Sequence, residues 1–178
     1  MCHNCAQHLS PLDACVAAVS YTYPWADCIA RFKFQADPSL ARALAHLMRH
    51  APWVEPALDK AHLVVPMPLS LARLRERGYN QTALLAEILV RVAGGGARVE
   101  PLLRRVVDTA TQTAFDRRSR MANLKNAFAL ARGASLNPDQ HYLLVDDVFT
   151  TGSTLNSCAL ALRRAGGLNL DVVTFGHG

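Results

Sequence analysis

Two adjacent carboxylates, Asp146 and Asp147, come directly after an apolar run at residues 142–145. Carboxylate oxygens accept hydrogen bonds from hydroxyl groups, such as the neighbouring hydroxyls of a ribose. The hydroxyl-rich turn that follows can donate to a phosphate through side chains and backbone N–H groups. That turn consists of Thr150, Thr151, Gly152, Ser153 and Thr154. The stretch therefore predicts a site for a sugar 5-phosphate.

The elements around this stretch are expected to place the turn at the start of a helix. Residues 142–145 read as a short buried strand, and apolar residues between positions 155 and 162 recur at the spacing of one helix face. Gly152 allows the backbone to approach a ligand, and the free N–H groups and dipole of a helix N-terminus favour an anion. The alternative is a plain strand end with an Asx turn and a helix cap.

A second polar group follows another apolar run, residues 62–66, with Arg73, Arg75 and Arg77 at alternate positions. Guanidinium groups fit phosphate and pyrophosphate, and ligands of open α/β sheets bind beyond the carboxyl ends of the strands. If the two strands are parallel neighbours, this arginine loop and the Asp-Asp stretch share one edge of the sheet. The alternative is a solvated basic surface.

An arginine-rich segment, residues 104–123, follows a candidate strand at residues 99–103. We expect this segment to close as a lid over a pyrophosphate, with a helix from about residue 116 that buries Phe128. The residues expected to serve the lid are Arg105, Thr109, Gln112, Arg120 and Asn123.

Several segments resemble known families. The apolar strand, Asp-Asp and Thr-Thr-Gly-x-Thr of residues 143–154 resemble the phosphoribosyl-pyrophosphate (PRPP) signature of type I phosphoribosyltransferases. Val-Pro-x-Pro-Leu at residues 65–69, Arg-Gly-Tyr-Asn-Gln at residues 77–81 and Ile-x-x-Phe-Lys-Phe at residues 29–34 are similar to the ComF/GntX family of competence protein F-like proteins. The similarity extends over residues 15–178.

The resemblance implies an α/β, type I phosphoribosyltransferase fold, with a central, mostly parallel twisted sheet flanked by helices. Residues 15–178 would form the phosphoribosyltransferase-like domain, in which residues 15–60 make a small hood over the acceptor. Residues 1–14 would be the remnant of an N-terminal zinc ribbon.

The implied reaction is transfer of phosphoribosyl from PRPP to an acceptor that the sequence does not identify. Mg²⁺ would bridge the pyrophosphate and the ribose hydroxyls. In this assignment the turn at residues 150–154 holds the 5-phosphate, and Asp146 and Asp147 hold the ribose hydroxyls. Arg73 and Arg77 hold the pyrophosphate. Arg105 and Arg120 close over the leaving group, and Asp147 is the best candidate for a general base.

A second class of function stays open, that of a non-catalytic accessory protein that binds PRPP or single-stranded DNA. The ComF family is linked to natural transformation and DNA uptake, so other uptake proteins are expected partners. The formal net charge of +5 suits polyphosphate and nucleic acid alike, and clustered arginines could follow a DNA backbone. Aromatic residues make up only 7% of the chain, and few lie beside the arginines, so no platform for stacking bases is evident.

The N-terminus contains Cys2-x-x-Cys5, the spacing of one half of a zinc site. No second Cys-x-x-Cys occurs, so we expect the other half of a ribbon upstream and zinc binding only with the full ribbon. Completion by His3, Cys15 or a second chain is the alternative.

The location of the protein is also predicted from what the sequence lacks. The sequence has no apolar run near the ~20 residues of a membrane span and no secretory signal at its start. We therefore expect a cytoplasmic protein without membrane insertion, and a homodimer is left open.

Overall fold

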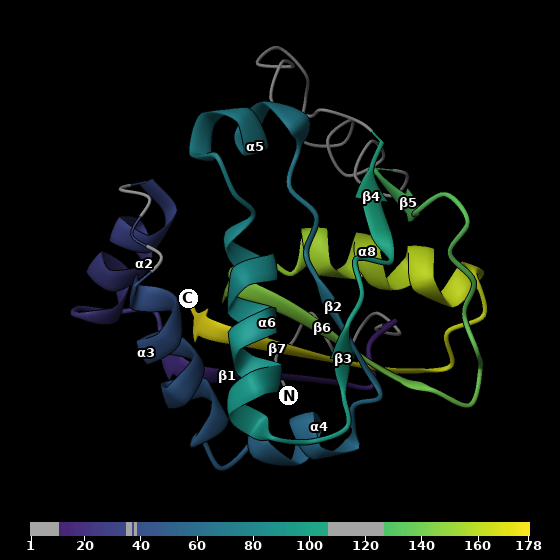
Figure 1. The fold of residues 1–178 in the computed structure, drawn as a ribbon, viewed down its shortest axis with the longest axis horizontal. Helices are drawn as coiled ribbons and strands as arrows, with labels where there is room; N and C mark the ends of the chain where they lie inside the picture. Colours follow the sequence, from purple (N-terminus) through teal and green to yellow (C-terminus); the bar gives the residue numbers. More distant parts are fainter. Residues whose placement is uncertain (1–10, 35–36, 38, 107–126) are drawn as a thin grey trace.

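A parallel sheet forms the centre of the computed structural model, which describes residues 11–34, 37, 39–106 and 127–178 (Figure 1). Its five strands are β1 (Ala14–Ser20), β2 (Leu63–Pro66), β3 (Arg98–Val99), β6 (His141–Phe149) and β7 (Asn169–His177). Their order is β1-β7-β6-β2-β3, and each neighbouring pair is parallel. The predicted α/β fold with a mostly parallel sheet is confirmed.

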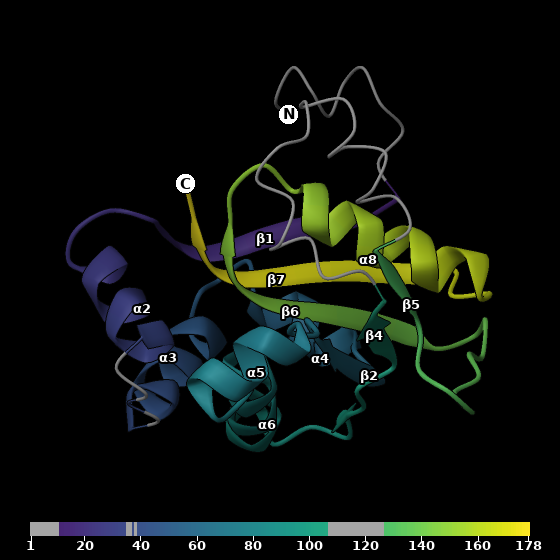
Figure 2. The ribbon, with the colours of Figure 1, turned by 90° about the horizontal axis from the view of Figure 1, so that it is seen from above.

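Helices cover both faces of this sheet (Figure 2). They are α2 (Trp25–Phe34), α3 (Ser39–Arg49), α4 (Glu55–Lys60), α5 (Leu71–Arg77), α6 (Gln81–Ala93) and α8 (Ser153–Arg164). Helices α3, α4 and α6 lie on one face, and α8 lies on the other. Alternate residues of β6 serve the two cores, since Leu143 and Val145 pack with α3 and α6 while Tyr142 and Leu144 pack with α8. Strand β6 is thus buried on both faces, as central parallel strands are.

The expected strand at residues 99–103 is wrong, because two separate strands occur there. Strand β3 ends at Val99, and β4 (Leu103–Arg105) pairs antiparallel with β5 (Phe128–Leu130) in a small second sheet. Pro101, between them, has no N–H to donate to a ladder. Phe128, which was expected to be buried by a helix, is buried in β5 instead, where its backbone pairs with Arg105.

Residues 15–60, the expected hood, form one strand of the sheet and part of the layer of helices on one of its faces. Strand β1 is the edge strand beside β7, and α2, α3 and α4 contribute to the core that also contains α6. The described residues include no helix long and apolar enough to cross a membrane.

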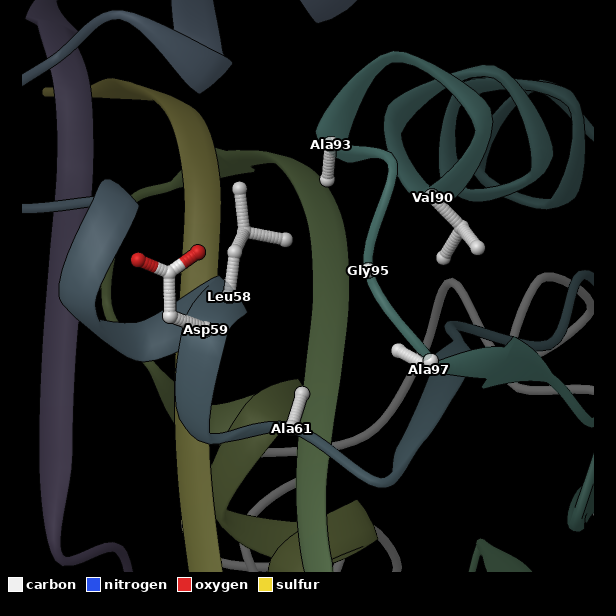
Figure 3. A pocket seen from close by; sticks show the side chains of 8 residues that line it. Leu58, Asp59, Ala61, Val90, Ala93, Gly95 and Ala97 are labelled. Carbon is white, nitrogen blue, oxygen red and sulfur yellow. The ribbon is translucent and has the colours of Figure 1, made fainter.

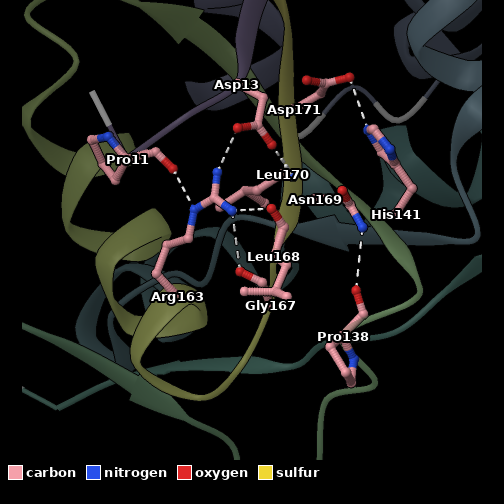
Figure 4. A network of polar contacts seen from close by, with 10 residues as sticks. All are labelled: Pro11, Asp13, Pro138, His141, Arg163, Gly167, Leu168, Asn169, Leu170 and Asp171. Atoms are coloured by element: carbon pink, nitrogen blue, oxygen red, sulfur yellow. Dashed lines mark hydrogen bonds and ion pairs between the residues drawn. The ribbon is translucent and has the colours of Figure 1, made fainter. Parts of the chain in front are cut away.

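Arg163 of α8 binds the residues just before β1, which in turn contact the amino end of β7 (Figure 4). Its Nε donates to the carbonyl of Pro11 at 2.8 Å, and its Nη2 lies 2.7 Å from Oδ1 of Asp13. The other oxygen of Asp13 accepts from the backbone N–H of Leu170 at 2.7 Å. This network is structural, because it lies at the opposite end of the strands from Asp146 and Asp147.

Candidate functional site

The connections from β2 and β6 leave the centre of the sheet in opposite directions. From β2 the chain passes through α5 and α6 to β3, on one side, whereas from β6 it passes through α8 to β7, on the other. Helices α6 and α8 accordingly lie on opposite faces (Figure 2). Neighbouring strands of this kind define a topological switch point, and ligands of open α/β sheets bind outside the carboxyl ends of such strands.

Asp146 and Asp147 lie at this switch point. Pairing of β2 with β6 ends where Pro66 lies opposite Val145, and Met67 donates a final backbone bond to the Val145 carbonyl at 3.0 Å. The sequence predicts that the strand ends at Val145, which is wrong. Strand β6 continues to Phe149 because β7 supplies backbone partners along that length. The two carboxylates therefore belong to the strand and not to a loop.

Because side chains alternate along a strand, the two carboxylates serve opposite faces of the sheet. Asp147, 4% exposed, faces α2 and α6. Its Oδ1 lies 2.7 Å from Nζ of Lys33, and its Oδ2 accepts from Nε2 of Gln81 at 3.1 Å. Asp146 faces α8, where its charge acts on Cys158, and its Oδ1 accepts from the Asp147 N–H at 2.8 Å.

The protonation of Asp146 is strongly perturbed. Desolvation of the carboxyl group, followed by the negative charge of Asp147, raises the pKa of Asp146 to about 8. The Asp147 N–H and the Lys33 ammonium oppose this rise without cancelling it. At neutral pH Asp146 therefore holds a proton, and it can donate a hydrogen bond as well as accept one.

The turn after β6 requires glycine at position 152. Gly152 has a φ of +69°, and a Cβ built there would lie 2.8 Å from Cζ of Phe149. Helix α8 begins at the next residue, and no side chain caps it. The oxygens of Thr151 and Ser153 lie 3.0 Å apart. The turn thus joins paired hydroxyls to a helix N-terminus, whose first N–H groups have no partner inside the helix.

The arginines after β2 do not lie in a loop, as the sequence suggested, but on helix α5. The side chain of Ser70 caps this helix by accepting from the Arg73 N–H at 3.2 Å, and Gly78, with a φ of +75°, ends it. Figure 1 shows α5 above the carboxyl end of β2. Arg73 and Arg77 are one turn apart and share a face, whereas Arg75 points elsewhere.

The two arginines of that face differ in their surroundings. Arg73 is half exposed, and its Nη1 lies 3.8 Å from a carboxylate oxygen of Glu76. The Arg77 guanidinium lies over the ring of Phe34, 5.2 Å from its centroid. The Nε of Arg77 is buried and has no hydrogen-bond partner among the described residues. Both side chains are thus available to an anion at the carboxyl end of β2.

The last turn of α2 makes several side-chain contacts with the end of α5 and the start of α6. The Tyr79 hydroxyl donates to the Phe32 carbonyl, Phe34 stacks on Arg77, and Lys33 and Gln81 meet at Asp147. Sequence reasoning missed Lys33 and Gln81 as site residues. One signal could have found them, because Lys33 and Gln81 both lie in segments that resemble the same family. Nothing in the spacing of these segments connects them to Asp147.

Of the other predicted site residues, Arg105 lies on the face of the sheet that α8 covers, and the rest lie outside the described residues. Arg105 of β4 lies over the Phe128 ring, 5.6 Å from its centroid. Burial and then the charge of Asp146 raise the pKa of the Cys158 thiol, and the charge of Arg105 opposes this rise. The remaining predictions lie outside the described residues and concern Thr109, Gln112, Arg120, Asn123, Cys2 and Cys5.

A small pocket lies away from the candidate site (Figure 3). It is lined by the end of α4, including Leu58 and Asp59, and by Val90 and Ala93 of α6 with the glycine-rich turn that follows. Ala61, also in its wall, comes just before β2 begins. The pocket is therefore at the amino end of the strands, opposite the carboxylates.

Known proteins share much of this chain, although no protein-family model matches it. It is 38% identical over 169 residues to competence protein F of Haemophilus influenzae, covering 93% of this chain and 73% of that protein. It is 34% identical over 174 residues to the DNA utilization protein YhgH of Salmonella typhimurium, covering 96% and 75%. Competence protein ComFC of Bacillus subtilis is 32% identical over 149 residues, which cover 82% and 57%.

Among solved structures, a hypoxanthine phosphoribosyltransferase from Staphylococcus aureus aligns with a TM-score of 0.43 and 13% identity, over 77% of this chain and 62% of that one. The sequence relationships are far closer. With more than 30% identity to proteins of which it covers about three quarters, the chain belongs to the competence protein F (ComF/GntX) family.

Proposed function

We propose that this protein is a phosphoribosyltransferase that binds PRPP with Mg²⁺ and acts in competence-linked DNA uptake. The observation that carries the proposal is the position of Asp146 and Asp147. They lie just beyond the pairing of β2 with β6, at the switch point, and the glycine turn into α8 follows within the same segment. The names of the relatives, competence protein F and DNA utilization protein, support the link to DNA uptake.

The proposed ligand lies across the carboxyl edge of the sheet. Its 5-phosphate is bound at the turn of residues 150–154, where helix N–H groups and hydroxyls can donate. Its ribose hydroxyls meet Asp147 from one face of the sheet and Asp146 from the other. Because Asp146 is protonated at neutral pH, it donates a hydrogen bond to a hydroxyl oxygen, while Asp147 accepts a hydrogen bond from a hydroxyl group. Arg73 and Arg77 on α5 neutralise the pyrophosphate.

The reaction breaks the bond between the anomeric carbon and the pyrophosphate oxygen, and a bond forms from that carbon to the nucleophile. The electron pair of the broken bond leaves with the pyrophosphate, so positive charge near its oxygens lowers the barrier. Arg73 and Arg77 supply such charge. Asp147 stays the candidate base for the proton that the nucleophile loses, in competition with its contacts to Lys33 and Gln81.

The side chains at the site fit a magnesium ion carried mainly by the ligand. Mg²⁺ prefers oxygen ligands and is commonly bound through one or two carboxylates together with substrate phosphates. Asp147 offers a carboxylate, and Asp146 offers the carbonyl oxygen of its protonated carboxyl group. The described residues contain no cluster of three metal-binding side chains that would make a protein cage. When bound, the ion would offset the charge of the departing pyrophosphate.

The first test is calorimetric titration of the protein with PRPP in the presence of Mg²⁺. We expect micromolar or tighter binding, and a loss of at least about tenfold when Asp146→Asn and Asp147→Asn are combined, mainly because the ligand loses its hydrogen bond to the charged Asp147 carboxylate, and such a bond contributes about 1.5–3 kcal/mol. Asp139→Asn, an exposed change in the turn before β6, is the control. Absence of PRPP binding by the unaltered protein would refute the proposal.

A second candidate function is binding of single-stranded DNA without turnover. One observation favours it, because Phe34 is 65% exposed and lies against Arg77, so an aromatic surface does adjoin an arginine. Bases stack on exposed aromatic side chains, and arginines contact the backbone. Titration with an oligonucleotide over a series of salt concentrations tests this. Affinity that falls steeply with salt and with Phe34→Ala would support it.

A further inference from the structure

Gln81 presents a buried acceptor that has no partner among the described residues. The residue is 3% exposed, and its Nε2 donates to Oδ2 of Asp147 at 3.1 Å. Its Oε1 is buried and accepts no hydrogen bond from any described residue. Buried polar atoms are normally paired, because an unmade hydrogen bond in the interior is destabilising. An unpaired atom at this place therefore points to a donor that arrives with a ligand.

The orientation of the amide is fixed by its neighbour. An ionised carboxylate has no proton to donate, so the amide must turn its NH₂ group toward Asp147 and its oxygen away from it. The start of α6 is also held firmly. Asn80 caps the helix and donates to the Met67 carbonyl at 3.1 Å, and the Thr82 hydroxyl donates to the same carbonyl at 2.7 Å. Gln81 is thus anchored at the end of β2.

Lys33 contacts the other oxygen of the same Asp147 carboxylate and can donate further hydrogen bonds. Its Nζ carries three N–H bonds, and the contact described for it is the one to Oδ1 of Asp147 at 2.7 Å. Its side chain is 21% exposed, so the cluster reaches solvent on the Lys33 side. Lys33, Asp147 and Gln81 together offer cationic donors, a carboxylate and a neutral acceptor.

We propose that Gln81 Oε1 receives a ring hydroxyl of the phosphoribosyl ligand, so that Gln81, with Lys33 and Asp147, selects ribose over a deoxyribose. This inference rests on the proposed function and adds to it a residue that determines specificity. A hydroxyl both donates and accepts, so it can donate to Oε1 of Gln81 and accept from Nζ of Lys33. A fully ionised phosphate has no proton for Oε1, and Asp147 would repel it.

The test compares ribose 5-phosphate with its 2-deoxy and 3-deoxy analogues, by calorimetry, in the unaltered protein and in Gln81→Met. Methionine keeps the length of the side chain but has no comparable acceptor. We expect the unaltered protein to bind ribose 5-phosphate about tenfold more tightly than one of the analogues, and Gln81→Met to bring that ratio near one. Affinity for the disfavoured analogue should stay within about threefold of its original value.

Controls separate a contact from a disturbance of the fold. Gln140→Met makes the same chemical change at the amino end of β6 and should leave the ratio unaltered. Gln81→Asn keeps the amide but withdraws its oxygen, and it replaces Gln81→Met if that variant does not fold. Lys33→Met should also reduce the ratio.

Two outcomes would overturn the inference. One is full selectivity retained in the Gln81 variant, as expected if only a buried water fills the position. The other is an unaltered protein that binds all three sugar phosphates equally. If the unaltered protein binds neither these ligands nor PRPP, the proposed function itself fails.

Discussion

Lys33 in the last turn of α2 and Asp147 in β6 form an ion pair, with 2.7 Å between Nζ and Oδ1. The carboxylate is almost fully buried, and its second oxygen accepts a hydrogen bond from Gln81. The pair joins the N-terminal helices to the switch point of the sheet. It also places a positive charge directly beside two adjacent acidic residues.

Removing this positive charge should destabilise the protein. Lys33→Met leaves the Asp147 carboxylate buried without its cation, and breaking buried pairs in this way costs about 3–5 kcal/mol. Because Lys33 retains some exposure, we expect about 3 kcal/mol, measured as the change in free energy of unfolding in urea. Lys60→Met, at an exposed position at the end of α4, is the matched control and should change stability by less than about 0.5 kcal/mol. Equal effects of the two substitutions would contradict a stabilising pair.

Asp146→Asn should stabilise the protein, and more so as pH rises. The pKa of Asp146 rises from 3.8 to about 8 on folding, so in this range the folded state holds a proton that the unfolded chain has lost. The contribution of Asp146 to the free energy of unfolding is therefore fully present below pH 3.8 and is lost as pH rises toward 8. Asparagine can accept the same bond from the Asp147 N–H, and it has no such proton to lose.

Urea unfolding at pH 5 and pH 8 measures this effect. We expect the gain in free energy of unfolding from Asp146→Asn to be larger at pH 8, by at least about 1 kcal/mol. Asp139→Asn is again the control, at an exposed position. The same gain at both pH values would show that Asp146 is ionised in the folded protein throughout.

Gly152→Ala should disturb the turn before α8 for two reasons that a control can separate. Its φ of +69° costs a non-glycine residue about 1–2 kcal/mol, and the new Cβ would lie 2.8 Å from Phe149. Gly133→Ala carries the first cost alone, since its φ is +78° and nothing lies within 4 Å. We expect Gly152→Ala to be more destabilising and to weaken binding of ribose 5-phosphate, with no such binding loss for Gly133→Ala.

A double substitution of Arg73→Ala and Arg77→Ala should weaken pyrophosphate binding more than binding of ribose 5-phosphate. Both side chains lie on one face of α5, and each charge-assisted hydrogen bond contributes about 1.5–3 kcal/mol. Arg75→Ala removes an arginine from another face of the same helix and should have little effect on either ligand. Calorimetric titration with both ligands makes the comparison. Equal losses for the two ligands would contradict the pyrophosphate role.

The sequence by itself determined the local architecture and the family. The apolar run before Asp146, the turn around Gly152 and the spacing of apolar residues in α8 are local signals, because periodicity and turn chemistry act over a few residues. The strand, turn and helix occur in that order, and the parallel sheet follows from repeated strand-helix units.

The tertiary structure alone decided how the site is assembled. The end of β6 depends on partners in β7, so a reading that stopped at Val145 could not place Asp146 and Asp147 on opposite faces. The helix that carries the arginines begins after Ser70 and ends at Gly78, which are local signals, but only the fold places this helix above the carboxyl end of β2 (Figure 1). The pairing of Lys33 with Asp147 joins distant segments through packing of α2, which no local pattern encodes. Charge and burial at the site are therefore properties of the fold, whereas the types of residue that supply them are properties of the sequence.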